Sequence, residues 1–151
     1  MRAIILAGGR GTRLYPYTTV LPKPLMPVNE KPVLEIIINR LKKYNFNNIT
    51  IATGYLAELI ESYFGNGEKF GVKINYSRER TPLGTAGPLS LIKNTDNDFL
   101  VINGDILTSL NFSRLIDFHL SPPRGIATIA VHRKKLKINL GVLEFDKVNL
   151  L

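Results

Sequence analysis

A short apolar run that ends in a cluster of glycines is the feature of this sequence that most constrains its fold. Residues 3–7 (AIILA) have the length of a strand and contain no polar side chain, which is typical of a strand buried on both faces of a parallel sheet. Gly8, Gly9 and Gly11 follow directly, and residues without a Cβ let the main chain turn sharply and let a ligand approach its N–H groups. We therefore predict a buried strand followed by a turn that suits an anion.

Cations and prolines come next along the chain. Arg10 and Arg13 follow the first glycines, and Pro22 and Pro24 flank Lys23, so we expect Lys23 in a fixed, extended segment. The planar guanidinium of arginine suits a polyphosphate, and a lysine acts as a point charge where negative charge accumulates.

The two familiar phosphate-binding motifs do not fit these glycines. The dinucleotide fingerprint GxGxxG fails because Leu14 stands where the third glycine belongs, and GxxxxGK followed by serine or threonine does not occur. From the glycines alone, an ordinary tight turn between a strand and a loop is an equal alternative.

Strand-like and helix-like stretches alternate along the rest of the chain. In residues 32–44, for example, Leu34, Ile38 and Leu41 share one helical face behind an initial proline. The expected strands are residues 3–7, 49–53, 72–76, 99–103, 126–132 and 141–145, and the expected helices are residues 32–44, 57–64, 84–93 and 113–120. This order predicts a doubly wound α/β fold with a mainly parallel sheet covered on both faces.

The composition indicates one domain. With 151 residues and 44% hydrophobic composition the chain is large enough for one core, and no linker or repeat divides it, so we expect a single domain over residues 1–151. No stretch approaches the length of a signal segment or a membrane span, and the absence of cysteine suits a reducing compartment. We therefore expect a cytoplasmic protein without a membrane partner.

The net charge of +8 attracts nucleotides and sugar phosphates, but also nucleic acid. The densest basic run, HRKKLK at residues 132–137, has no aromatic side chains that could stack on bases, and a solvated loop is its ordinary interpretation. We therefore expect no nucleic-acid partner. His119 and His132 lack a second metal ligand in the pattern and are expected to be structural or solvent-facing.

Several strings along the chain resemble the signature of the sugar-1-phosphate nucleotidyltransferases. They are GGRGTRL at residues 8–14, PKPLMP at residues 22–27, TPLGTAGPL at residues 81–89, VINGD at residues 101–105 and NLGVLEFD at residues 139–146. The strings occur in the order expected of the family and cover almost the entire sequence. The resemblance implies a Rossmann-like nucleotidyltransferase fold and an Mg²⁺-dependent enzyme that condenses a nucleoside triphosphate with a sugar 1-phosphate, giving a nucleoside diphosphate sugar and pyrophosphate.

Chemistry of this kind depends on positioning and on neutralising charge during in-line attack on the α-phosphorus, so no nucleophilic side chain is required. The sequence agrees, because it contains no cysteine, no HExxH or CxxC spacing and no Ser-His-Asp pattern with an evident nucleophile elbow.

The resemblance also implies roles for individual residues. Arg13 would grip the departing pyrophosphate, and Lys23 would bridge toward the α-phosphate and the sugar phosphate. The nucleotide would be bound by Leu6, Ala7, Gly8, Gly9, Gly11, Thr12, Glu79, Gly84 and Thr85, and the sugar phosphate by Asn103, Gly104 and Gly141. Asp105, at the carboxyl end of an apolar strand, would hold Mg²⁺ on phosphate oxygens; taken alone, this aspartate could instead cap the helix or turn that follows.

The base and the sugar are implied by the form of one string. PLGTAG resembles the guanylyltransferase branch more than the thymidylyl branch, so GTP and mannose 1-phosphate are the favoured partners. Thr85 stands near the start of the helix expected over residues 84–93, and Glu79 matches an acidic residue that often precedes the proline in that branch. A solvated loop charge is the alternative for Glu79.

The family's domain continues beyond the point that matches NLGVLEFD, so the resemblance implies a truncated chain in which the C-terminal part of the domain is missing. The alternative to an enzyme is therefore a catalytically inactive module that binds a nucleotide or a partner. A shortened sheet leaves strand edges unpaired, from which we expect a homo-oligomer.

Overall fold

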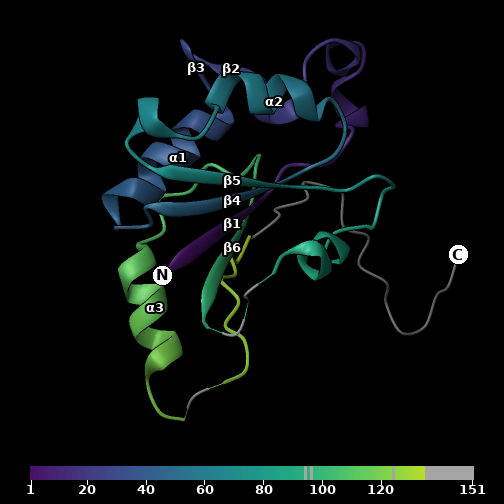
Figure 1. Cartoon of the computed structure of the whole chain (residues 1–151). Coiled ribbons are helices and arrows are strands. Elements are labelled where there is room, and N and C mark those ends of the chain that lie inside the picture. The colour runs from purple at the N-terminus through teal and green to yellow at the C-terminus, as the bar shows by residue number, and fades with distance from the viewer. Residues whose placement is uncertain (94, 96, 124, 135–151) are drawn as a thin grey trace, which may run out of the picture. The chain divides into compact units, whose positions relative to one another are not determined.

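The computed structural model describes residues 1–93, 95, 97–123 and 125–134. The chain forms two compact units, Met1–Phe112 and Ser113–Leu151, and each is described by itself. Helices and strands of the first unit alternate along the chain (Figure 1).

A four-stranded sheet with the order β5-β4-β1-β6 forms the centre of the first unit. Its strands are β1 (Arg2–Leu6), β4 (Asn48–Thr53), β5 (Lys73–Arg78) and β6 (Phe99–Asn103). All neighbouring strands run parallel, and Leu6 at the end of β1 is in register with Ala52 of β4 and Asn103 of β6. The prediction of a mainly parallel, doubly wound sheet is therefore confirmed.

The strand order places a topological switch point between β1 and β6. The chain moves outward from β1 to β4 and β5, and then returns to the other side of β1 to form β6. Loops that follow the carboxyl ends of β1 and β6 consequently diverge, and ligands of open α/β sheets bind in the crevice that such loops leave.

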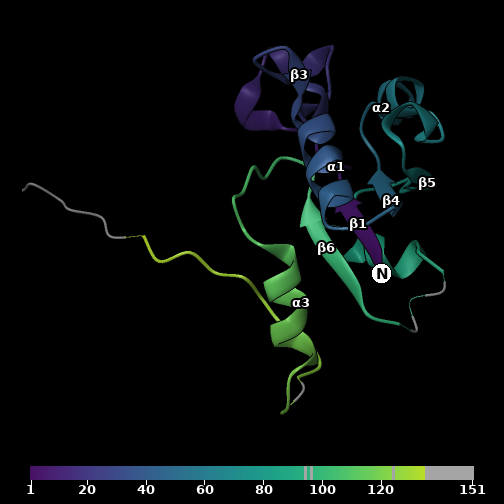
Figure 2. The same cartoon turned by 90° about the vertical axis from the view of Figure 1, so that its left-hand side faces the viewer.

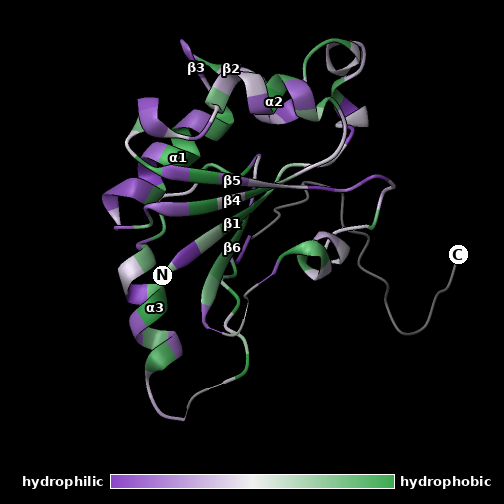
Figure 3. Cartoon of the chain, in the orientation of Figure 1, coloured by the Kyte–Doolittle hydropathy of each residue, from purple (hydrophilic) through white to green (hydrophobic). Residues whose placement is uncertain are grey.

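Helices α1 (Val33–Lys43) and α2 (Ala57–Phe64) lie on one face of the sheet, and the 3₁₀ helix η5 (Gly87–Leu91) lies on the other (Figures 1 and 2). Leu34, Ile38 and Leu41 of α1 are fully buried, as their helical spacing predicts. Apolar side chains also fill the middle of β1 and β4, which begin hydrophilic and turn hydrophobic along their length (Figure 3).

An aromatic cluster extends the core beyond the strands. Phe46 and Phe112 are almost completely buried, and their ring centroids lie 6.2 Å apart in an edge-to-face arrangement. Tyr44 packs against the same Phe112 ring at 5.3 Å. These contacts hold the segment that follows β6 against the end of α1.

Short elements that sequence periodicity does not reveal fill the stretch between β1 and α1. They are the 3₁₀ helices η1 (Thr12–Leu14), η2 (Tyr17–Thr19) and η3 (Lys23–Leu25) and the small strands β2 (Pro27–Val28) and β3 (Lys31–Pro32), which pair antiparallel. A further 3₁₀ helix, η4 (Glu68–Phe70), precedes β5.

The expectation that Lys23 lies in an extended segment was wrong. Pro22 is extended, but Lys23 begins η3, where the N–H of Leu25 donates to the carbonyl of Pro22 at 2.8 Å. Pro24 is tolerated there because the first turn of a helix needs no donor from that position.

The helix expected over residues 84–93 is shorter than predicted. Only η5 forms, because Gly84 adopts a left-handed φ of +78° and Pro88 stands inside the predicted helix. Thr85 therefore lies in the turn before η5, not in a helix.

Helix α3 (Phe112–Leu120) begins at the last residue of the first unit and includes all of the predicted residues 113–120, which belong to the second unit. His119 accepts or donates one hydrogen bond with Thr128, Nδ1 to Oγ1 at 2.9 Å, and His132 is exposed, as expected for structural or solvent-facing histidines. Residues 126–132 do not form the predicted strand. An apolar run becomes a strand only where a neighbouring strand accepts its hydrogen bonds, and Ile126 and Val131 are largely exposed here. The strand predicted at residues 141–145 lies outside the described residues.

Candidate functional site

A cavity of about 540 Å³ lies at the carboxyl ends of β1 and β6, at the switch point of the sheet. Its lining residues are Leu6, Ala7, Gly8, Gly9, Arg10, Gly11, Thr12, Arg13, Leu14, Lys23, Pro24, Ala52, Glu79, Pro82, Gly84, Thr85, Pro88, Asn103, Gly104 and Asp105. Every site residue predicted within the described part of the chain is among them, whereas the predicted Gly141 lies outside the described residues.

The glycine turn has a conformation that a side chain would disturb. Gly11 is left-handed, with φ 63° and ψ 35°, and a Cβ there would lie 3.0 Å from Thr18 Cγ2 and 3.1 Å from Lys23 Cβ. The buried Thr18 hydroxyl donates to the carbonyl of Gly11 at 3.2 Å, and the N–H of Leu14 donates to the same oxygen at 2.9 Å. The turn is thus held by its own contacts, and its glycine is required for both dihedral and spatial reasons.

Glu79 extends over the main chain of two glycines. A Cβ on Gly54 would lie 2.7 Å from Glu79 Oε1, and a Cβ on Gly8 would overlap the same oxygen. Oε2 accepts the N–H of Leu83 at 3.1 Å, and the Glu79 N–H donates to the carbonyl of Thr53 at 2.9 Å. These contacts place Glu79 in the wall of the cavity and argue against the alternative of a solvated loop charge.

Main-chain hydrogen bonds fix the two strand ends that form the floor of the cavity. The N–H of Gly104 donates to the carbonyl of Leu6 at 2.8 Å, and the N–H of Ala7 donates to the carbonyl of Ala52 at the same distance. A Cβ on Gly104 would lie 3.1 Å from the Leu6 oxygen and 3.3 Å from the Ala7 Cβ. Residue 104 must therefore be small for β6 to approach β1 at this point.

An ion pair joins the two sides of the cavity. Lys23 Nζ donates to Asp105 Oδ2, and the two side chains are 31% and 33% exposed. Asp105 does not cap a helix, because the next helix, α3, begins only at Phe112. Sequence analysis predicted both residues for the site but not that they contact each other.

The side chains of the cavity that could coordinate a metal suit a magnesium ion whose other coordinating oxygens come from a bound phosphate compound and from water. Among the described residues, His, Cys, Asp and Glu side chains do not gather in groups of three or more that could hold a metal ion. Asp105 supplies one carboxylate beside cationic side chains, and Mg²⁺ is usually bound by one or two carboxylates together with phosphate oxygens and water.

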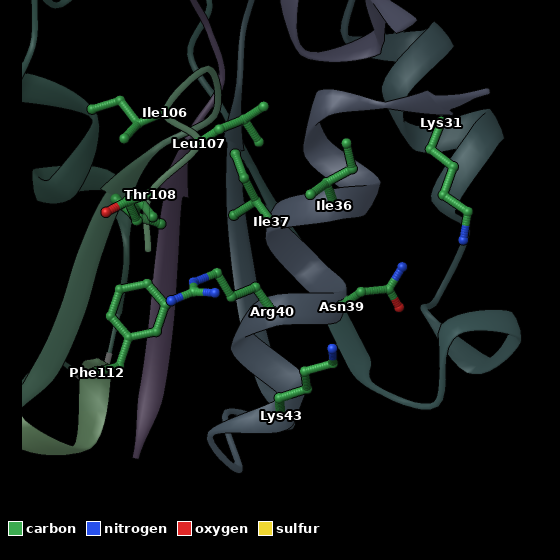
Figure 4. A pocket seen from close by; sticks show the side chains of 11 residues that line it. Lys31, Ile36, Ile37, Asn39, Arg40, Lys43, Ile106, Leu107, Thr108 and Phe112 are labelled. Atoms are coloured by element: carbon green, nitrogen blue, oxygen red, sulfur yellow. The ribbon is translucent and has the colours of Figure 1, made fainter. Parts of the chain in front are cut away.

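A second cavity, of about 370 Å³, lies between α1 and the segment after β6 (Figure 4). Arg40 points toward Phe112 there; its Nη2 donates to the carbonyl of Leu110 at 2.7 Å, and its guanidinium carbon lies 5.7 Å from the ring centroids of Tyr44 and Phe112. The lining is mostly apolar and includes no predicted site residue, so this arginine has a packing role in the first unit.

Sequence reasoning missed several lining residues. Pro82 and Pro88 belong to the string TPLGTAGPL, whose position in the motif was a usable signal. The sequence carries no signal that Ala52 lines the cavity. It is an apolar residue inside a strand, and it reaches the cavity only because the strand register sets it beside Leu6.

Comparison with known proteins agrees with this geometry. The family model described as "Nucleotidyl transferase" matches residues 2–150. This chain belongs to the nucleotidyl transferase family.

Relatives within the family differ in the nucleotide base that their names specify. The chain is 39% identical to a UTP--glucose-1-phosphate uridylyltransferase of Synechocystis over 142 residues, which cover 85% of this chain and 36% of that protein. It is also 39% identical to the mannose-1-phosphate guanylyltransferase catalytic subunit beta of Dictyostelium discoideum over 153 residues, 99% of this chain and 42% of the relative.

A solved structure shows the same fold. The crystal structure of a putative glucose-1-phosphate thymidylyltransferase from Bacillus anthracis superposes with a TM-score of 0.73 and 36% identity over 78% of this chain and 49% of that one. The nucleotidyl transferase chain therefore spans half or less of the length of these three proteins. Within its described residues, no helix is long and apolar enough to cross a membrane.

Proposed function

We propose that this nucleotidyl transferase chain carries the nucleotide-binding part of an enzyme that transfers a nucleotidyl group from a nucleoside triphosphate to a sugar 1-phosphate and releases pyrophosphate. The observation that carries the proposal is the cavity at the switch point, in which a glycine turn, Arg13, Lys23 and Asp105 line one space. Main-chain N–H groups and cations are the donors that a polyphosphate requires.

The proposed reaction is an in-line displacement at the α-phosphorus. The sugar phosphate oxygen forms a bond to phosphorus while the bond to the pyrophosphate oxygen breaks. Arg13 would bind the departing pyrophosphate through its planar guanidinium, and Lys23 would neutralise charge at the α-phosphate. Mg²⁺, held by Asp105 and by phosphate oxygens, would supply additional charge neutralisation.

We propose GTP as the nucleotide. The guanine edge presents the N1–H and N2–H₂ donors side by side, and Glu79 places a carboxylate, which only accepts hydrogen bonds, in the wall of the cavity. Uracil and thymine present a single N–H on the corresponding edge. The guanylyltransferase named among the relatives supports the same choice and, with it, mannose 1-phosphate as the sugar phosphate.

Pyrophosphate release tests the proposal. The chain is incubated with Mg²⁺, each nucleoside triphosphate in turn and mannose 1-phosphate or glucose 1-phosphate. Release with GTP that is lost in Lys23→Ala and in Asp105→Ala is the expected result. Saturable GTP binding without any release would instead support a nucleotide-binding module. Glu79→Gln should weaken GTP binding more than UTP binding, because an amide nitrogen repels the guanine donors; equal weakening would contradict the role of Glu79.

We also propose that the chain self-associates. Among the described residues, β6 pairs only with β1, and Val101 of β6 is 39% exposed. An unpaired strand edge with exposed apolar side chains invites another chain. Equilibrium sedimentation should show species larger than a monomer, and a single monomeric species at high concentration would contradict this proposal.

A further inference from the structure

The ion pair between Lys23 and Asp105 occupies two groups that the proposed function needs for other ligands. Asp105 Oδ2 accepts from Lys23 Nζ, so the ammonium group stands at the oxygen where a magnesium ion would bind. The same ammonium group is the one proposed to reach the α-phosphate. While the pair is closed, Oδ2 of Asp105 is occupied by the ammonium group, and the ammonium group is held at the carboxylate.

We propose that Lys23 is the resting counter-ion of Asp105 and that a divalent cation arriving with the nucleotide replaces it, which releases the ammonium group toward the phosphates. This inference rests on the proposed function. In the chain without a ligand, the ammonium group of Lys23 neutralises the Asp105 carboxylate. Binding of the metal ion and release of the lysine then occur together, as one exchange of cations.

The surroundings allow the end of the lysine to move while its stem stays in place. Lys23 Cβ and Cδ lie 3.1 Å and 3.7 Å from the position that a Cβ on Gly11 would take, so the stem packs along the glycine turn. Lys23 also begins η3, whose first hydrogen bond runs from Leu25 to Pro22. The backbone of Lys23 is therefore fixed, and rotation about the outer side-chain bonds is sufficient to move the ammonium group along the turn.

The carboxylate side of the pair is fixed as well. Gly104, directly before Asp105, donates its N–H to the carbonyl of Leu6 at 2.8 Å, which ties the turn to β1. About one third of each side chain of the pair is exposed, so water can solvate both groups during the exchange. Partly exposed ion pairs are weak, and opening this one should change a binding constant by about two- to fivefold.

The test measures binding of inorganic tripolyphosphate in EDTA, a probe that has neither a base nor a metal. Asp105→Asn removes the partner of Lys23 and should tighten binding of tripolyphosphate by about two- to fivefold. Glu79→Gln is the matched control, because it removes one carboxylate charge from the same cavity without releasing Lys23. The gain in tripolyphosphate affinity from Glu79→Gln should be smaller than the gain from Asp105→Asn. Asp105→Ala serves as a second variant if the asparagine side chain itself binds the lysine.

A double-mutant cycle isolates the exchange. In a Lys23→Met background, Asp105→Asn should give no larger gain than Glu79→Gln does, because no ammonium group remains to be released. Two results would overturn the exchange. One is an equal gain from Asp105→Asn and Glu79→Gln in the chain with Lys23. The other is an Asp105→Asn gain that still exceeds the Glu79→Gln gain in the Lys23→Met background.

The outcomes also separate this inference from the proposed function. If the double-mutant cycle gives the expected coupling between residues 23 and 105 but GTP yields no pyrophosphate, the exchange at Asp105 stands and the proposed reaction is rejected. Pyrophosphate release with no coupling between residues 23 and 105 would retain the reaction and reject the exchange. Absence of tripolyphosphate binding in every variant would reject both.

Discussion

Replacing Gly11 with alanine should damage both the stability of the chain and its nucleotide site. Alanine at φ 63° and ψ 35° carries left-handed backbone strain of about 1–2 kcal/mol. The new Cβ would also lie 3.0 Å from Thr18 Cγ2 and 3.1 Å from Lys23 Cβ, and Thr18 is only 5% exposed and has little room to move. Overpacking of this kind costs about 1–3 kcal/mol, so the free energy of unfolding should fall by roughly 2–5 kcal/mol in total.

Gly71 offers a matched control far from the glycine turn in sequence. Its backbone has nearly the same conformation, with φ 69° and ψ 35°, but a Cβ there meets only the flexible end of Lys42. Gly71→Ala should therefore cost the backbone strain, about 1–2 kcal/mol, together with the hydrogen bond that Lys42 Nζ donates to the Phe70 carbonyl at 2.9 Å where the lysine is displaced, and should leave nucleotide affinity unchanged.

Urea unfolding followed by circular dichroism gives the stability of both variants, and fluorescence titration with a labelled GTP analogue gives their affinity. Gly11→Ala should lose more stability than Gly71→Ala and should also lose affinity, because the Lys23 stem is displaced. If the two variants are equally destabilised and Gly11→Ala binds GTP as the original chain does, the packing of Gly11 against Thr18 and Lys23 contributes neither to stability nor to nucleotide affinity.

Three further predictions concern the packing of the first unit. Phe46→Ala should reduce the free energy of unfolding by about 3–5 kcal/mol in urea, because the ring is 1% exposed; a change below about 1 kcal/mol would contradict its place in the core. Gly67→Ala should destabilise more than Gly71→Ala in the same assay, since its Cβ would lie 2.6 Å from the Val72 carbonyl oxygen, and an equal loss would refute that contact. Burial, and secondarily the charge of Glu61, raises the pKa of Tyr76 to about 12 from 10.0. The folded chain thus keeps a proton that the unfolded chain loses, so stability should fall as the pH rises from 10.0 to about 12. Tyr76→Phe should show a smaller fall in its urea midpoint over this range, and an identical pH dependence would argue against burial of the phenol.

Long, strongly patterned segments were predictable because their structure follows from local composition. β1 and β4 arise from apolar runs that are buried, β6 arises from an apolar run at the edge of the sheet, and α1 places its apolar residues at helical spacing behind a proline. The segments whose predicted structure was wrong, and the short elements that were not predicted, each depend on only a few residues. Lys23 lies in a 3₁₀ turn instead of an extended segment. Residues 126–132 have the composition of a strand, but no strand within the described part of the chain pairs with them.

By itself, the sequence determined the parallel sheet, the glycine turn and the family, because apolar periodicity, glycine spacing and the order of the motifs are all local or linear properties. Only the tertiary structure decided which of these residues meet. Lys23 and Asp105 are 82 residues apart and pair because β1 and β6 end side by side, and Glu79 reaches Gly8 and Gly54 because β4 lies between β5 and β1. Strand order and register set those contacts, and they result from packing between distant segments, which no single stretch of sequence encodes.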